Sequence, residues 1–232
     1  MHERLPGVAR NGAAPVNRLP DVRLRVARVA EVLRDLPADS ITWLSASEQV
    51  RLARLRVPAR RDQYLAGHWL VRSLLAAEGG TPFDWSLDER PGLPPAVQDH
   101  AGLQVSLSHS GLWIAAAVSA APIGIDIEQR DPPRSALRHF EHLLLADDDT
   151  PGTLDDDALL QRWVIKEAWV KRHHGSALPD QLARLRIARC RLADADVRLY
   201  CSGALHLGIA AGSADIGEVE GCAPEAWRVT PS

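Results

Sequence analysis

Apolar residues recur at helical spacing along much of the N-terminal part of the chain. Residues 1–20 contain several Pro and Gly with little periodicity, which predicts a mobile tail. Residues 22–36 alternate apolar and charged side chains and then become rich in Ala and Leu, which indicates a strand leading into a short helix. A capped helix is predicted from about 45 to 57 and ends before a proline. A second helix is predicted over 61–77, before a Gly-Gly pair.

A strand pattern replaces the helical one in the middle of the chain. Residues 105–109 alternate apolar and polar, residues 112–119 are almost continuously apolar, and residues 123–128 form a third strand-like run. Turn residues separate these runs, so we predict a compact antiparallel meander. The preceding segment, 81–102, is rich in Pro and Gly and predicts loops around short strands.

The same order, helices first and strands after, returns in the C-terminal part. Helices are predicted around 135–145 and from about 158 to 173, and alternation over 183–211 predicts a second sheet. The expected fold class is α+β, with two similar α+β halves that form a pseudo-dimer within one chain. The expected divisions are the tail at 1–20, the N-terminal half at 21–121, the C-terminal half at 122–212 and a C-terminal tail at 213–232.

The composition is that of a folded globular protein and argues against several functions. Hydrophobic residues make up 46% of the 232 residues, and a formal net charge of −3 provides no global basic field for nucleic acid. No apolar run approaches the ~20 residues of a membrane span, and the N-terminus lacks the apolar core of a signal peptide. Three cysteines without paired or metal-type spacing favour a reducing compartment, so the cytoplasm is expected.

Lysine is rare in this chain and confined to one short segment. Lys166 and Lys171 are the only lysines, against 25 arginines, and they flank Glu167. Where Arg usually supplies positive charge, a lysine indicates a position that needs a compact charge on a flexible stem. Glu167 and Lys171 are four positions apart and lie adjacent on one helix face. A surface ion pair worth about 0.3–0.5 kcal/mol would look the same, but the apolar neighbours and two flanking tryptophans favour a partly buried site.

Two acidic residues interrupt the third strand-like run. Asp126 and Glu128 alternate on the predicted strand and therefore point the same way. Two carboxylates on one face suit Mg²⁺, which prefers hard oxygen ligands and keeps positions for water and phosphate. A half-exposed strand would show the same alternation. Gly124 favours a site, because a glycine inside a strand often marks the close approach of a backbone or a ligand. Together with the lysines, these acids indicate an enzyme that handles metal and phosphate.

A histidine ends the first strand of the predicted meander. His109 lies between Ser108 and Ser110, just before a Ser-Gly turn. A single histidine is more often structural, but here the neighbouring hydroxyls and the turn amides provide donors for an anion.

Three segments taken together resemble a known family. They are similar to the motifs of the 4′-phosphopantetheinyl transferases, specifically the longer Sfp type, and the combination is far more specific than any one motif. The resemblance extends from about Leu44 to Gly212. The segments are Ser108-His109-Ser110-Gly111, Gly124-Ile125-Asp126-Ile127-Glu128 and, about forty residues later, Trp163-Val164-Ile165-Lys166-Glu167-Ala168-Trp169-Val170-Lys171.

The resemblance implies a fold and a reaction. The fold has two similar α+β halves in one chain, with the active site in the cleft between them. In the implied reaction, coenzyme A binds with Mg²⁺, a serine of a carrier protein attacks the β-phosphate, and 3′,5′-ADP leaves. The implied partners are coenzyme A and an acyl or peptidyl carrier protein, with no nucleic acid and no membrane. A monomer is expected, because the two halves already form the cleft.

By motif position, the resemblance also assigns the chemistry to four residues. Asp126, Glu128 and Glu167 would bind Mg²⁺, and Glu167, directly or through a water, would help to deprotonate the serine. Lys171 would contact the coenzyme A diphosphate. Such an arrangement is chemically reasonable, because a metal and a lysine offset charge on the diphosphate as the P–O bond breaks.

Further residues are expected to hold coenzyme A. Ser108 and His109 would bind phosphate groups, and Lys166 is expected near the same site. Arg60 and Arg61 are candidates for the 3′-phosphate. A solvated helix face would explain an arginine-rich segment equally well. The accompanying candidates from the same segment are Arg54 and Arg56.

Some positions depart from the pattern of the family. Leu93 stands where members often have the lysine of Gly-Lys-Pro, and Gln63 stands where many have an arginine. Phe140 is present, but the acids Asp147 and Asp148 lie further along, so neither is assigned to the metal.

Alternatives to transfer remain open at this point. One is a catalytically silent homologue that binds coenzyme A or a carrier domain, and another is a Mg²⁺-dependent phosphohydrolase or nuclease. The intact acidic and lysine positions argue against the first, and the lack of a basic-aromatic surface argues against nucleic acid. The sequence leaves undecided whether the carrier belongs to fatty-acid, polyketide or nonribosomal peptide synthesis.

Overall fold

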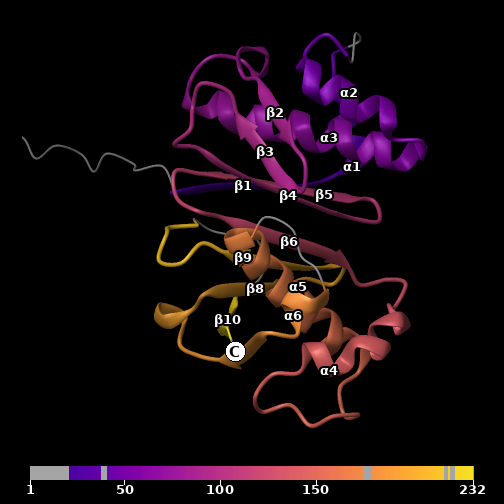
Figure 1. The fold of residues 1–232 in the computed structure, drawn as a ribbon, viewed down its shortest axis with the longest axis vertical. Coiled ribbons are helices and arrows are strands. Elements are labelled where there is room, and N and C mark those ends of the chain that lie inside the picture. The colour runs from indigo at the N-terminus through magenta and orange to yellow at the C-terminus, as the bar shows by residue number, and fades with distance from the viewer. Residues whose placement is uncertain (1–20, 38–40, 175–178, 217–218, 220–222, 232) are drawn as a thin grey trace, which may run out of the picture.

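The computed structural model has two parts stacked along its long axis, and each contains helices and a sheet (Figure 1). This mixed content confirms the predicted α+β class. No helix in the described part of the chain is long and apolar enough to cross a bilayer. The predicted tail at 1–20 lies outside the described residues, which are 21–37, 41–174, 179–216, 219 and 223–231.

The N-terminal part contains a three-stranded antiparallel sheet in the order β1-β5-β4, with α3 packed against it. The two-stranded hairpin β2-β3 lies between α2 and β4 (Figure 1). Its strand β2 contacts α2, and its strand β3 contacts β4. The strands are β1 (Val22–Arg28), β2 (Leu87–Arg90), β3 (Leu93–Val97), β4 (Gln104–Ser110) and β5 (Trp113–Ser119). The helices are α1 (Val29–Arg34), α2 (Ala46–Arg54) and α3 (Pro58–Leu75), followed by the 3₁₀ turns η1 (Ala76–Glu78) and η2 (Pro82–Asp84).

Local signals explain where these helices begin. Ser45 Oγ accepts a hydrogen bond from the Glu48 amide, and the Ser45 amide donates to Glu48 Oε2 at 2.7 Å, which forms a capping box at the start of α2. Pro58 occupies the first position of α3, where its missing N–H leaves no hydrogen bond unmade. Both predicted helices are present. The first ends at Arg54, three residues before the predicted end, and α3 spans Pro58–Leu75 where 61–77 was predicted.

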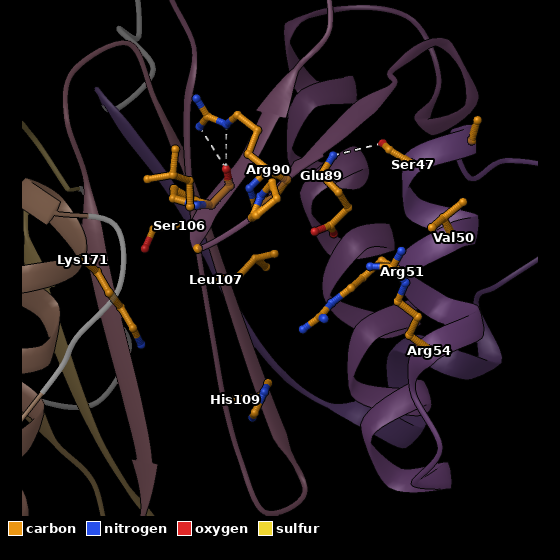
Figure 2. Close-up of a pocket in the computed structure, with 16 residues that line it drawn as sticks. Ser47, Val50, Arg51, Arg54, Glu89, Arg90, Ser106, Leu107, His109 and Lys171 are labelled. Carbon is orange, nitrogen blue, oxygen red and sulfur yellow. Dashed lines mark hydrogen bonds between the residues drawn. The ribbon is translucent and has the colours of Figure 1, made fainter.

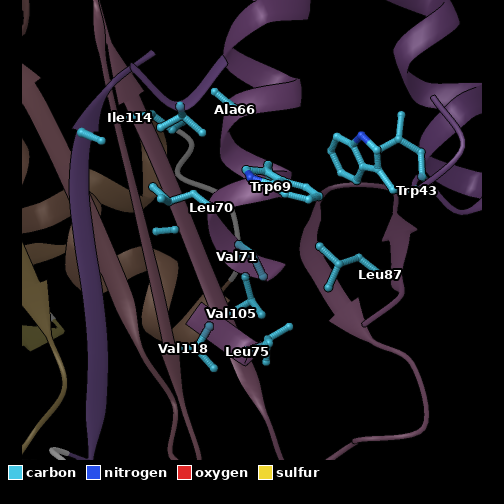
Figure 3. Packing of buried hydrophobic residues seen from close by; sticks show 14 of the residues in the cluster. Trp43, Ala66, Trp69, Leu70, Val71, Leu75, Leu87, Val105, Ile114 and Val118 are labelled. Carbon is cyan, nitrogen blue, oxygen red and sulfur yellow. The ribbon is translucent and has the colours of Figure 1, made fainter. Parts of the chain in front are cut away.

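The apolar stripe predicted on the second helix packs into the core of the N-terminal part (Figure 3). Trp69 and Leu70 of α3 are buried in the same cluster as Val105 of β4 and Val118 of β5. Trp43 meets Trp69 edge to face, with ring centroids 5.2 Å apart. This core fixes α3 on the sheet and gives α2 and the β2-β3 hairpin a rigid support.

The C-terminal part contains a five-stranded antiparallel sheet in the order β6-β9-β8-β10-β7, covered by the long helix α5. The two sheets therefore differ in strand number and order within the described residues. The strands are β6 (Gly124–Gln129), β7 (Leu185–Arg189), β8 (Val197–Cys201), β9 (Leu205–Ala210) and β10 (Glu225–Pro231). The helices and 3₁₀ segments are η3 (Ser135–Phe140), α4 (Glu141–Leu144), α5 (Asp156–His174), α6 (Pro179–Leu182) and η4 (Leu192–Asp194).

Two local predictions in this part are corrected. The segment expected to be a C-terminal tail contains β10, which pairs with both β7 and β8. Trp227 and Val229 alternate inward, and the guanidinium of Arg162 lies 4.4 Å from the Trp227 ring centroid. The sequence analysis missed this strand because its inward positions are few and its apolar burial is decided by neighbouring strands. The helix expected around 135–145 is mostly the 3₁₀ segment η3, with a short α4.

Gly124 and Gly208 allow α5 to approach the C-terminal sheet closely. A Cβ atom at Gly124 would collide with the backbone of α5 at Ala168 and Arg172, and one at Gly208 would lie 2.9 Å from the Val164 carbonyl oxygen. The interpretation of Gly124 as a point of close backbone approach is therefore confirmed. This approach places the side chains of α5 beside those of β6.

The two sheets meet where β4 runs beside β6. Serine side chains of β4 accept hydrogen bonds from backbone amides of β6, in place of a backbone ladder. The alternation on β4 turns all three serines toward β6. The bonds run to Ser106 Oγ from the Ile125 amide (2.9 Å), to Ser108 Oγ from the Ile127 amide (3.2 Å) and to Ser110 Oγ from the Gln129 amide (3.0 Å).

Candidate functional site

Two predicted site residues lie together at this junction of the sheets. Asp126 and Glu128 are buried and share one face of β6, as the alternation predicted. Burial and the charge of Asp126 raise the pKa of Glu128 to about 7, although Ser110 and Arg134 oppose the rise. The Asp126 carboxylate is therefore close enough to disfavour the ionisation of Glu128.

Glu167 joins this pair from α5. Burial raises its pKa to about 7, and the nearby charges of Asp126 and Glu128 add to the rise. Lys171 acts in the opposite direction and favours the ionised form. A carboxyl group with such a pKa can accept and release a proton near neutrality. The three acids that the sequence analysis assigned to one site therefore lie within electrostatic range of one another.

Lys171 reaches the same cluster from one turn further along α5. Its Nζ lies 2.6 Å from Asp126 Oδ1 and 3.2 Å from Ser108 Oγ. Ser108 Oγ itself donates to Asp126 Oδ1 at 2.8 Å. The ammonium therefore links β4, β6 and α5, the three elements that carry the motifs.

One further residue contacts the acids and was missed by the sequence analysis. Arg134, in the loop before η3, pairs through Nη2 with Glu128 Oε2 and donates to Ser110 Oγ at 2.9 Å. Ser110 Oγ also donates to Glu128 Oε2. The spacing of residues in the sequence does not predict this contact, because the contact depends on how the chain turns back after β6.

One carboxylate oxygen of this cluster has no hydrogen-bond donor among the described residues. Asp126 Oδ2 is buried and accepts no hydrogen bond from any described residue. Among the described residues, no three or more His, Cys, Asp or Glu side chains lie close enough together to hold a metal ion as they are placed here. Lys171 and Arg134 instead provide positive charge next to the acids.

A cavity of about 1010 Å³ lies between α2, the β2-β3 hairpin and β4, and Lys171 of the cluster is in its lining. Lys171 lies at one side of it, and Arg51 and Arg54 of α2 lie at the other (Figure 2). Its volume is at the upper end of those of small-molecule sites. Leu93, the departure from the Gly-Lys-Pro pattern, is among the lining residues. The other lining residues include Ser47, Val50, Glu89, Arg90, Ser106, Leu107 and His109.

His109 faces this cavity (Figure 2) and is held from the side of α3. Arg60 Nη1 lies 3.0 Å from the ring nitrogens of His109 and donates to Gln63 Oε1 at the same distance. Gln63 in turn donates to the Gly111 carbonyl oxygen at 2.9 Å. Desolvation and the Arg60 charge lower the pKa of His109, which favours the neutral ring. Arg60 is thus a neighbour of the cavity through His109.

The structure does not bring Arg61 and Lys166 to the cavity. Arg61 Nη1 donates to the Leu52 carbonyl oxygen at 2.9 Å and so satisfies the end of α2. Lys166 Nζ donates to the carbonyl oxygens of Leu143 (2.6 Å) and Leu182 (3.2 Å), and desolvation lowers its pKa to about 8. Backbone carbonyls engage both side chains, and neither residue lines the cavity, so their expected role in binding coenzyme A stays a prediction. Arg51, which the sequence analysis did not select, lines the cavity instead.

Comparisons with known proteins agree with the motifs. No family model matches the chain. It is 32% identical over 124 residues to 4′-phosphopantetheinyl transferase psf-1 of Bacillus pumilus, covering 51% of this chain and 52% of that protein. It is 35% identical over 149 residues to 4′-phosphopantetheinyl transferase Sfp of Bacillus subtilis, covering 60% and 64%. It is 31% identical over 166 residues to 4′-phosphopantetheinyl transferase HetI of Nostoc sp., covering 66% and 65%.

These matches span about half to two thirds of the length of the curated relatives. The resemblance to 4′-phosphopantetheinyl transferases of the Sfp type is thereby confirmed. The activity given in these names is the activity of the relatives.

Proposed function

We propose, from this similarity, that the chain transfers the 4′-phosphopantetheine group from coenzyme A to a serine of an acyl or peptidyl carrier protein. The observation that supports this most strongly is the meeting of Asp126, Glu128, Glu167 and Lys171 beside a cavity of about 1010 Å³. The reaction forms a bond between the serine oxygen and the β-phosphorus. It breaks the bond from that phosphorus to 3′,5′-ADP, which leaves.

The acids fit a hard divalent cation, for which we propose Mg²⁺. Asp126 Oδ2 is a buried acceptor without a donor among the described residues, and Glu128 and Glu167 add carboxylate oxygens of the kind that Mg²⁺ prefers. By motif position these three residues would hold the ion, which requires their side chains to come closer together than they are placed here. When bound, Mg²⁺ supplies charge neutralisation for the diphosphate.

Coenzyme A is proposed to occupy the cavity with its phosphates between basic groups. Lys171 and His109 lie on the side of the acids, where the diphosphate would bind, and Ser108 is adjacent to both. Arg51 and Arg54 lie across the cavity and are suited to the 3′-phosphate, because a guanidinium matches phosphate oxygens in a fork. They would provide the phosphate contacts that the lysine and arginine of other family members provide at the positions of Leu93 and Gln63.

The chain's own acid is proposed to move the proton. Glu167 accepts the hydroxyl proton of the carrier serine, directly or through a water, as the oxygen attacks. Lys171 orients the diphosphate and offsets the charge that develops on the leaving group. Both act beside the β4–β6 junction, where we propose that two related α+β halves meet, one from β1 to β5 and one from β6 to β10. A single chain carries all of these groups, so the proposed acting form is a cytoplasmic monomer.

The experiment that tests the function is mass spectrometry of an apo carrier protein incubated with the chain, coenzyme A and Mg²⁺. We expect the carrier to gain the mass of one phosphopantetheine arm, and the gain to disappear with EDTA. Apo carriers from fatty-acid, polyketide and peptide synthesis are compared in parallel, and each carrier's serine-to-alanine variant serves as the matched control.

The other outcomes decide between the alternatives. Tight coenzyme A binding without any mass gain would identify a silent homologue. Release of phosphate from coenzyme A without a carrier would identify a phosphohydrolase. Absence of coenzyme A binding would overturn the assignment of the cavity.

A further inference from the structure

Arg134 contacts the acidic cluster from a loop outside all three motifs. Its Nη2 donates hydrogen bonds to Glu128 Oε2 and, at 2.9 Å, to Ser110 Oγ. Glu128 is buried, whereas the Arg134 side chain is 41% exposed. The guanidinium therefore reaches a buried acid from the solvent side, at the end of a long side chain.

The positive charge at the acids in this structure comes from side chains. Lys171 pairs with Asp126, and Arg134 pairs with Glu128. A buried carboxylate stays ionised only when opposite charge is near, so these pairs compensate part of the cluster's negative charge. One ammonium and one guanidinium together carry the same charge as one divalent cation. A cation bound at Asp126 and Glu128 would face the guanidinium at short range, where like charges repel strongly.

The surroundings of Arg134 provide a place for the displaced guanidinium. Arg134 also lines a second cavity of about 510 Å³, whose lining includes Asp155, Asp156 and Asp157. Arg138 pairs with Asp156 at 2.7 Å in the same region. Arg130 pairs with Asp157 there, so a rotation of the Arg134 side chain away from Glu128 would place its charge near Asp155, whose two neighbours are already paired.

We infer that Arg134 is a positioning residue that competes with the divalent cation for Glu128 and thereby sets how tightly the cation binds. The inference rests on the proposed function, because it takes Asp126, Glu128 and Glu167 as the cation ligands. Without the cation, Arg134 holds Glu128 in place. With the cation bound, the guanidinium lies toward the second cavity.

The test is the binding of Mn²⁺ to the full chain, followed by electron paramagnetic resonance without coenzyme A or carrier. Arg134→Gln is expected to lower the Kd about tenfold, equivalent to about 1.4 kcal/mol. Arg138→Gln is the matched control, because Arg138 comes from the next turn of chain but pairs with Asp156. Its Kd should change by less than about twofold. Adding Glu128→Gln to Arg134→Gln should abolish the gain in Mn²⁺ affinity.

The possible results separate this inference from the proposed function. Equal Kd values for wild type and Arg134→Gln would overturn the competition and leave the cation site standing. Equal gains in Arg134→Gln and Arg138→Gln would overturn it too, because the effect would then be one of net charge. Absence of Mn²⁺ binding in every variant would overturn both the competition and the metal part of the function. Should Arg134→Gln not fold, Arg134→Lys takes its place, with a smaller gain expected because lysine lacks the planar fork.

Discussion

The two lysines of the chain stand on one helix yet have different surroundings. Lys171 Nζ lies 2.6 Å from Asp126 Oδ1 beside the large cavity. Lys166 Nζ is bound by the carbonyl oxygens of Leu143 and Leu182, which fastens α4 and α6 to α5. Five positions along a helix of 3.6 residues per turn rotate the two side chains to different faces. At the residue scale, the two lysines therefore have two separate roles: Lys171 contacts an acid of the site, and Lys166 binds backbone carbonyls.

Alanine at each lysine should separate these needs. Lys166→Ala is expected to lower the free energy of unfolding by about 2–3 kcal/mol, because it leaves a cavity and two buried carbonyls without their donor. Lys171→Ala should raise the KM for coenzyme A and lower kcat. Urea denaturation and steady-state kinetics measure the two effects. A raised KM in folded Lys166→Ala, with Lys171→Ala unchanged, would reverse the assignment.

At the element scale, the contact between α5 and β6 decides whether the acids meet. Gly124 of β6 faces the α5 backbone at Ala168 and Arg172. Glu167 and Lys171 lie on this stretch of α5, so the distance between helix and strand controls their distance from Asp126. A shift of the helix would disturb both the carboxylate cluster and the lysine contact.

Gly124→Ala should therefore damage both stability and activity. The added Cβ meets backbone atoms that cannot rotate away, and we expect a loss of about 3 kcal/mol or more in the free energy of unfolding. Gly203→Ala is the matched control, because a Cβ there meets nothing within 4 Å and its effect should be close to zero. Denaturation curves and transfer assays on both variants are the measurement. Equal stability of the two would contradict the close approach.

A buried ion pair joins α2 to α3 in the N-terminal part. Arg72 Nη2 lies 2.6 Å from Glu48 Oε2, and both side chains are fully buried. His68 Nδ1 is 2.7 Å from Glu48 Oε1. Burial alone would raise the pKa of Glu48, but hydrogen bonds from His68 and Arg72 and their charges lower it to about 2. The pair holds α2, whose arginines line the cavity, against α3.

The stability of the chain should fall in acid through this group. The folded pKa of about 2 is below the ordinary value of 4.5, so the stabilisation is present above about pH 4.5 and is lost as pH falls toward 2. The expected loss is about 3 kcal/mol. Urea denaturation between pH 2.5 and pH 6 should show a shallower pH slope in Glu48→Gln than in the exposed control Glu31→Gln.

A second variant keeps this prediction testable. Glu48→Gln leaves Arg72 buried without its partner, so it is expected to be less stable at every pH. The double variant Glu48→Gln/Arg72→Met removes both charges and should show the same shallow slope with better stability. A slope equal to that of wild type would contradict the assignment of acid sensitivity to Glu48.

At the scale of the whole molecule, serine side chains connect the two sheets. Hydroxyls of β4 accept from amides of β6, and two of the same serines also donate to the acids of the site. The junction of the sheets and the candidate site are therefore one structure. We expect the two parts to unfold together, because separating them would expose the apolar cluster shared by Ala117 of β5 and Ile125 and Ile127 of β6 to water.

Ser106→Ala tests this connection away from the acids. The Ile125 amide would lose its acceptor, and the free energy of unfolding should fall by about 1–3 kcal/mol in a single transition. Ser73→Ala is the control, because its hydroxyl donates only within α3, to the Trp69 carbonyl oxygen, and its loss should cost less than about 0.5 kcal/mol. Two separate transitions in wild type would contradict a shared unfolding unit.

Local periodicity accounts for what the sequence alone determined. The apolar stripe of α3, the shared face of Asp126 and Glu128, and the adjacency of Glu167 and Lys171 follow from the geometry of a single helix or strand. The motifs also led to the resemblance that the curated relatives confirm. The three structural features depend on residues within a few positions of one another, and the resemblance depends on the identities of three short segments.

Tertiary structure decided the contacts between segments that are distant in the sequence. Arg134 reaches Glu128, Arg51 faces the cavity, and Lys166 turns to the carbonyls of α4 and α6 only because whole elements are placed beside one another. The strand β10 likewise exists because β7 and β8 provide its partners. Hydrogen bonding and burial across the chain select these arrangements, and no local spacing records them. The types of residue at the site could therefore be predicted from the sequence, whereas the packing of the two sheets and α5 determined their partners.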